Sequence, residues 1–157
     1  MNGNMELLGT SELFKGAPEA MLEQVSAKSS VRRFKKGEMI FKEGTREKEF
    51  YIVKSGLVAI NKNIAGGRKR NLSNLGPGEV FGEITLFDED PRSADAEASE
   101  DTELIVFRND DFLKLLNDNP VFGYEVQKNI IRVLCRRLRA TDEMLKEGVI
   151  WGFRIQA

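Results

Sequence analysis

Two side chains of opposite charge lie close together in one short segment and limit the chemistry that this chain could perform. Glu83 follows Gly82 within the run 81–87, and Arg92 follows the acidic loop 88–90. A guanidinium can hold two phosphate oxygens at once, and a glycine beside a helix start lets backbone N–H groups approach an anion. A carboxylate repels phosphate but accepts a hydrogen bond from a sugar hydroxyl. The segment therefore predicts a pocket for a small phosphorylated sugar.

The neighbours of this pair extend the candidate site. The hydroxyl of Ser93 can donate to the same phosphate, and the backbone N–H groups near Ile84 and Ala94 can assist. Two alternatives remain open: Ser93 could bond only to its own turn, and Glu83 and Arg92 could simply pair and hold a surface loop. No side chain of this set activates water, so we expect the phosphate ester to be bound intact and predict no enzyme activity.

Composition excludes several classes of protein. The chain has 157 residues, enough for one hydrophobic core, and a net charge of −1, which argues against general attraction to DNA or to an anionic membrane. It has no histidine, so Ser-His-Asp hydrolysis, histidine-ligated haem and most zinc catalysis are excluded. The single Cys135, with no apolar run of membrane-spanning length and no signal peptide, predicts a cytoplasmic protein without metal or cofactor.

Periodicity divides the chain into four parts. Residues 1–30 read as a helical lead-in, and residues 31–107 are short apolar runs punctuated by glycine, which is typical of a β-roll or jelly roll. Residues 108–148 are helical, with the longest helix predicted over 120–147. The apolar tail 149–157 is expected to pack on its own β-roll or to contact a second subunit or a target protein.

The long helix carries an apolar stripe that suggests dimerisation. Its residues recur at spacings of four or three: Val126, Ile130, Leu134, Leu138, Thr141 and Leu145. Such a stripe often reflects core packing alone. Its length and aliphatic regularity nevertheless favour a parallel helix pair across a two-fold axis, and so a homodimer.

Segment 81–94 resembles the phosphate-binding cassette of cyclic nucleotide-binding domains, the family that includes catabolite activator proteins and the regulatory subunits of cyclic AMP-dependent kinase. The pattern Phe-Gly-Glu, an apolar run, a short loop and Arg-Ser-Ala matches without insertion. Three more segments resemble family motifs in the same order, at 34–44, 50–56 and 75–78. The resemblance covers about residues 12–145 and implies a β-roll followed by a long C-terminal helix.

The resemblance also implies roles for individual residues. Glu83 would accept the ribose 2′-hydroxyl, and Arg92 would hold the cyclic phosphate. Thr141 matches a threonine that reaches adenine in relatives, unless it is only a tolerated polar position in the helix seam. Asp142 stands where relatives contribute a serine from the partner subunit, and could accept from the adenine amino group. Ser93 and Thr141 favour cyclic AMP over cyclic GMP as the ligand.

Acidic residues near the cassette keep a rival function open. If Asp95 or the loop 88–90 faced the pocket, anion binding would suffer, and the domain could be a degenerate interaction module that keeps the fold. The leading hypothesis is a receptor module whose C-terminal helix moves on binding and signals to a separate effector protein. Residues 148–157 are too few for a DNA-reading motif, so direct DNA binding is not expected. A weaker hypothesis is a DNA-associated regulator acting through a separate basic subunit.

Overall fold

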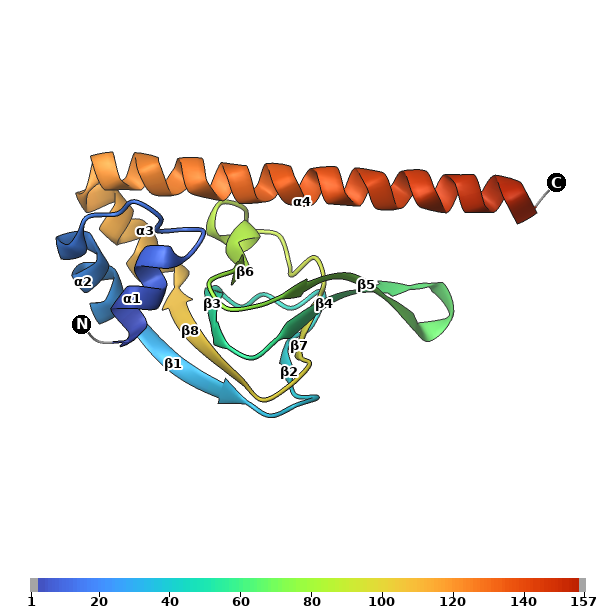
Figure 1. Ribbon diagram of the computed structural model, residues 1–157, viewed down its shortest axis with the longest axis horizontal. Coiled ribbons are helices and arrows are strands. Elements are labelled where there is room, and N and C mark those ends of the chain that lie inside the picture. Colours follow the sequence, from blue (N-terminus) through green and yellow to red (C-terminus); the bar gives the residue numbers. More distant parts are fainter. Residues whose placement is uncertain (1–2, 156–157) are drawn as a thin grey trace.

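The structure is a computed structural model that describes residues 3–155, with side-chain surroundings described for residues 3–148. Within this range four α-helices flank eight β-strands (Figure 1). The helices are α1 (Gly3–Thr10), α2 (Glu19–Ala27), α3 (Asn109–Asp118) and α4 (Pro120–Ile155). The strands are β1 (Ser29–Phe34), β2 (Met39–Phe41), β3 (Glu49–Ser55), β4 (Val58–Ile64), β5 (Arg68–Leu75), β6 (Val80–Phe81), β7 (Asp95–Ala98) and β8 (Thr102–Arg108). Two short 3-10 helices, η1 (Ala65–Gly67) and η2 (Glu83–Leu86), complete the chain.

The strands form two four-stranded sheets in which every pair is antiparallel. Their orders are β1-β8-β3-β6 and β2-β7-β4-β5. This confirms the predicted mainly-β fold with flanking helices and a long C-terminal helix. No helix in the described range combines the length and apolarity that crossing a membrane requires.

Strand β3 shows how the sequence builds two cores. Successive side chains of a strand point to opposite faces. Phe50 and Ile52 therefore join the apolar cluster beneath the helices, whereas Tyr51 and Val53 join the cluster between the two sheets. The helices thus cover one face of the first sheet, and the second sheet covers the other.

Helix α4 runs along one edge of the molecule in the view of Figure 1. The chain's own core covers only part of the predicted apolar stripe. Val126 and Ile130 are buried against the chain's own core, but Leu138 and Leu145 are each 63% exposed. Core packing therefore accounts for the first part of the stripe, and its second part stays exposed.

The end of α4 differs from the prediction. The helix continues past Gly148 to Ile155, because a single glycine costs only about 1 kcal/mol in a helix and does not end it. The expected docking of the apolar tail 149–157 concerns side chains outside the described residues.

Candidate functional site

Gly82 makes the turn between β6 and η2 that opens the cassette. Its φ is +74°, in the left-handed region where glycine is favoured. A Cβ at this position would lie 2.8 Å from Nη1 of Arg92 and 3.3 Å from the carbonyl oxygen of Glu49. The absence of a side chain therefore lets the guanidinium approach the turn closely.

Arg92 is held inside the protein by backbone carbonyls. Arg92 is only 3% exposed to solvent. Nη1 donates to the carbonyl oxygen of Gly82 at 3.1 Å, and Nη2 donates to that of Glu49 at 2.6 Å. The guanidinium carbon lies 4.1 Å from the centre of the Phe41 ring. Burial lowers the pKa of Arg92 from its usual value, but a guanidinium titrates so far above neutrality that it stays charged.

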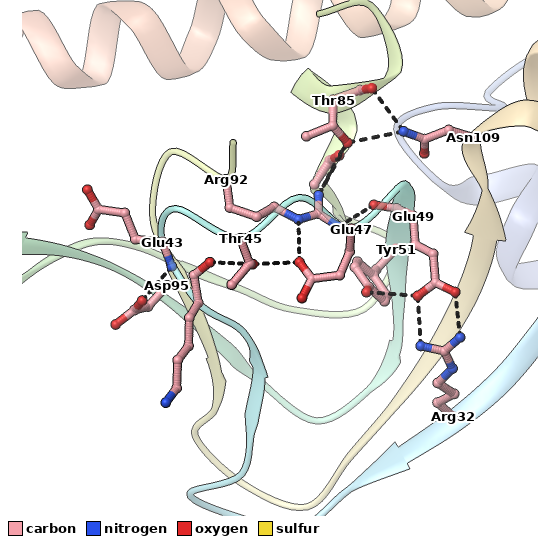
Figure 2. Close-up of polar contacts among 12 residues, drawn as sticks. Arg32, Glu43, Thr45, Glu47, Glu49, Tyr51, Thr85, Arg92, Asp95 and Asn109 are labelled. Atoms are coloured by element: carbon pink, nitrogen blue, oxygen red, sulfur yellow. Dashed lines mark hydrogen bonds and ion pairs between the residues drawn. The ribbon is translucent and has the colours of Figure 1, made fainter. Parts of the chain in front are cut away.

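The charge of Arg92 has no carboxylate at hydrogen-bond distance among the described residues. Its ion-pair partner there is Glu47, whose Oε2 lies 3.7 Å from Nε (Figure 2). The Nε–H is buried without a hydrogen-bond partner in the described part of the chain. Burying a cation without a closely paired anion is costly. Arg92 is therefore a strong candidate for binding an external anion.

Glu83 pairs with a residue that the sequence did not indicate. The residue is 1% exposed, and its Oε1 accepts from Nη1 of Arg137 on α4 at 2.7 Å. Nη2 of Arg137 also donates to the carbonyl oxygen of Val80. The alternative in which Glu83 and Arg92 pair with each other is wrong, because each has a different partner. Glu83 and Arg137 instead tie the cassette to α4.

A cavity of about 340 Å³ lies between the cassette, the β-roll and α4. The cassette contributes Gly82, Glu83, Ile84, Thr85, Pro91, Arg92, Ser93 and Ala94. Strands contribute Phe41, Ile60, Leu72, Ser73 and Phe81, and α4 contributes Leu134, Arg137, Leu138, Ala140, Thr141 and Met144. Apolar walls with a few convergent charged groups are typical of small-molecule sites.

The cavity brings together seven of the eight predicted ligand-binding residues. Ser93 is exposed at its edge, where its carbonyl oxygen accepts from the Lys62 ammonium at 2.7 Å. Thr141 lines it from α4, and its hydroxyl donates to the carbonyl oxygen of Arg137 at 3.0 Å. Asp142 is exposed and does not line this chain's cavity. No group of acidic or cysteine side chains suited to a metal ion occurs within the described range.

Asp95 and the acidic loop 88–90, which could oppose anion binding, do not line the cavity. Asp95 is buried elsewhere, where it pairs with Lys69 at 2.8 Å and accepts from the backbone N–H of Glu43 at 2.7 Å. Burial alone would raise the pKa of Asp95, but these two donors together lower it below its usual value. The loop residues 88–90 are exposed and line a different cavity beside α3. The charge of Asp95 is thus already balanced within the protein.

Sequence reasoning missed the cavity wall on α4 except for Thr141. Arg137 lies four residues before Thr141, one helical turn away on the same face, so this spacing could have identified it. The apolar wall residues Phe41 and Met144 gave no comparable signal, because an apolar residue in a strand or helix predicts core packing first.

The cassette turn, the buried arginine and the cavity beside the C-terminal helix are features of a domain that binds a small ligand, and comparison gives its family. The profile of the cyclic nucleotide-binding domain family matches residues 31–119, more than half of the chain. The chain belongs to this family.

Individual relatives agree with this assignment. The cyclic AMP receptor protein of Thermus thermophilus is 39% identical over 132 residues, covering 84% of this chain and 59% of the relative. The crystal structure of Thermus thermophilus catabolite activator protein matches with a TM-score of 0.76 at 38% identity, over 87% of this chain and 62% of that one. The regulatory domain of PKA from Toxoplasma gondii, crystallised with cAMP, matches with a TM-score of 0.67 at 28% identity, over 74% and 44%. The chain thus spans about three fifths of the first two proteins.

Proposed function

We propose that the protein is a cytoplasmic receptor for a cyclic nucleotide, with cyclic AMP preferred over cyclic GMP. The observation that carries the proposal is the buried, incompletely paired Arg92 at the wall of a cavity that Glu83 also lines. Membership of the family and the cAMP-related names of several relatives support the same ligand class.

The charged groups of the cavity suit the two ends of a cyclic ribose phosphate. Arg92 would donate to the phosphate oxygens, and Ser93 would add its hydroxyl. Glu83 has a second oxygen, Oε2, without a hydrogen-bond partner in the described part of the chain, and this oxygen would accept the ribose 2′-hydroxyl. Each charge-assisted bond contributes about 1.5–3 kcal/mol net, so two or three of them supply a large share of a micromolar affinity.

Helix α4 is the element through which binding would be communicated. It contributes Arg137 and Thr141 to the cavity, so a nucleotide would contact the cassette and α4 together. The Glu83–Arg137 pair already links the two. A ligand that binds one position of α4 more tightly than another shifts the population toward that position. The output would pass from α4 to a separate effector protein.

An exposed row of apolar residues on α4 supports a homodimer. Tyr124, Ile131, Leu138 and Leu145 recur at every seventh residue, and all four are exposed. We call these four residues the α4 seam. A seven-residue repeat is the spacing that keeps two helices in contact along their length. In a parallel pair, the exposed Asp142 of one subunit would approach the cavity of the other.

Titration calorimetry with Arg92→Ala tests the proposal. Wild-type protein should bind cyclic AMP, and loss of the guanidinium should weaken binding by about 2–5 kcal/mol. Arg139→Ala is the matched control, because Arg139 is exposed on α4 and does not line the cavity. Its affinity should stay within twofold of wild type.

A domain that keeps the fold without binding nucleotide is the alternative. The positions of Asp95 and of the loop 88–90 outside the cavity speak against it. Absence of heat and of any thermal shift with millimolar cyclic AMP or cyclic GMP would establish that alternative.

A further inference from the structure

Asn109, the first residue of α3, does not line the cavity but contacts η2 and the residue before β3, beside the groups that hold Arg92. Its backbone N–H donates to the carbonyl oxygen of Lys48 at 3.0 Å, next to Glu49. Its side-chain Nδ2 donates to the carbonyl oxygen of Thr85 at 2.9 Å and to the hydroxyl of Thr85 at 3.2 Å (Figure 2). The residue is only 3% exposed, so these bonds are shielded from water.

The contacts of Thr85 continue this chain to the guanidinium. Its hydroxyl donates to the carbonyl oxygen of Gly82 at 3.1 Å and accepts from Nη1 of Arg92 at 3.4 Å. Gly82 accepts from the same Nη1, and Glu49 accepts from Nη2. Among the described residues, the terminal nitrogens of Arg92 therefore have three acceptors. The first is the Thr85 hydroxyl, and the second is the Gly82 carbonyl, which is bonded to that hydroxyl. The third is the Glu49 carbonyl, and Glu49 follows Lys48, which is bonded to the backbone of Asn109.

An amide side chain suits this position because it must donate to two oxygens of one residue. An aspartate in its place would be isosteric but would put an acceptor against the Thr85 carbonyl, and an alanine would leave that carbonyl without its partner. Bonds arranged in a buried chain also orient one another. The Asn109 amide thus bonds to Thr85, whose hydroxyl accepts from Nη1 of Arg92.

We propose that Asn109 is a positioning residue for the phosphate-binding guanidinium, acting through Thr85. This inference rests on the proposed function and adds a determinant of affinity that lies outside the cavity. Without the Asn109 amide, Thr85 loses its anchor to α3, and Arg92 gains freedom that a bound phosphate must then remove.

Calorimetric titration of the whole chain with cyclic AMP tests this role. Asn109→Ala and the isosteric Asn109→Asp should each weaken binding about 5- to 20-fold, the equivalent of one to two hydrogen bonds. Asn119→Ala is the control, because the Asn119 amide also donates to a backbone carbonyl of α3, that of Leu115, and lines no part of the nucleotide cavity. It should change affinity less than twofold.

A double-mutant cycle separates positioning from general destabilisation. Thr85→Val removes the hydroxyl that links Asn109 to Arg92, so adding Asn109→Ala to it should weaken binding less than threefold further. The calorimetric stoichiometry reports the folded fraction of each variant, and the affinity reports the site. Losses that multiply in full in the double variant would identify an independent structural role and overturn the inference.

The outcomes for the two proposals are distinct. A wild-type protein that binds neither cyclic AMP nor cyclic GMP at millimolar concentration overturns the proposed function and this inference with it. A wild-type protein that binds, while both Asn109 variants stay within twofold of it, overturns the inference alone.

Discussion

Replacing Gly82 by alanine should be far more damaging than the same change at another glycine with the same backbone conformation. Gly82 and Gly66 both have positive φ, at 74° and 79°. A side chain in the left-handed region costs about 1–2 kcal/mol, so this part of the loss is shared. A Cβ on Gly66 would have no heavy atom within 4 Å, whereas one on Gly82 would meet Nη1 of Arg92 at 2.8 Å.

The magnitude follows from what must move at Gly82. The clashing atom ends a flexible side chain, but that side chain is buried and bonded to the carbonyls of Gly82 and Glu49. Displacing it loosens charge-assisted bonds and adds about 1–3 kcal/mol to the backbone cost. We expect Gly66→Ala to lose about 1–2 kcal/mol of unfolding free energy and Gly82→Ala about 2–5 kcal/mol.

Urea denaturation of both variants measures the difference, provided that the slopes with denaturant concentration agree. Titration with cyclic AMP adds a second signal, because only Gly82→Ala displaces the guanidinium and should weaken binding. Equal losses of stability in the two variants, with unchanged affinity in both, would show that Arg92 is not packed against Gly82 as described.

Three further predictions concern charges and surfaces. Arg137→Ala leaves the buried Glu83 unpaired and should cost about 2–4 kcal/mol in urea denaturation, a loss that Glu83→Gln in the same chain should partly restore; no change would refute the pairing. The pKa of Asp95 is lower in the folded protein than in the unfolded chain, so its carboxylate stabilises the fold at pH values above the unfolded pKa, and this contribution disappears as the pH falls through the folded pKa. Asp95→Asn should therefore flatten the loss of unfolding free energy below about pH 4. An unaltered dependence of stability on pH would contradict this. Leu145→Glu should shift sedimentation from dimer to monomer without lowering the melting temperature by more than a few degrees, whereas a wild-type monomer at tens of micromolar would exclude the α4 seam as an interface.

The sequence predicted the cassette well because its chemistry is local. Gly82, Glu83 and Arg92 lie within 11 consecutive positions, and their residue types describe a turn, an acceptor and a donor without knowledge of the fold. The β-roll was equally accessible, since short apolar runs such as 50–53, separated by glycine at turns, are a local pattern.

The partners of these side chains were not accessible from local patterns. Arg137 meets Glu83 across 54 positions, and Glu49 meets Arg92 across 43. Nothing near Asn109 indicates that its amide reaches Thr85, because this contact exists only after α3 packs beside the cassette. The division of α4 into a core face and an exposed seam likewise depends on which side the β-roll covers.

The central claim is that one cavity holds the phosphate at Arg92 and the ribose at Glu83. A crystal structure of the protein with cyclic AMP tests it most directly. The account predicts phosphate oxygens about 2.7–2.9 Å from the Arg92 guanidinium, with the 2′-hydroxyl bonded to Glu83. A nucleotide bound elsewhere, or a phosphate in this cavity that contacts neither Arg92 nor Ser93, would contradict it.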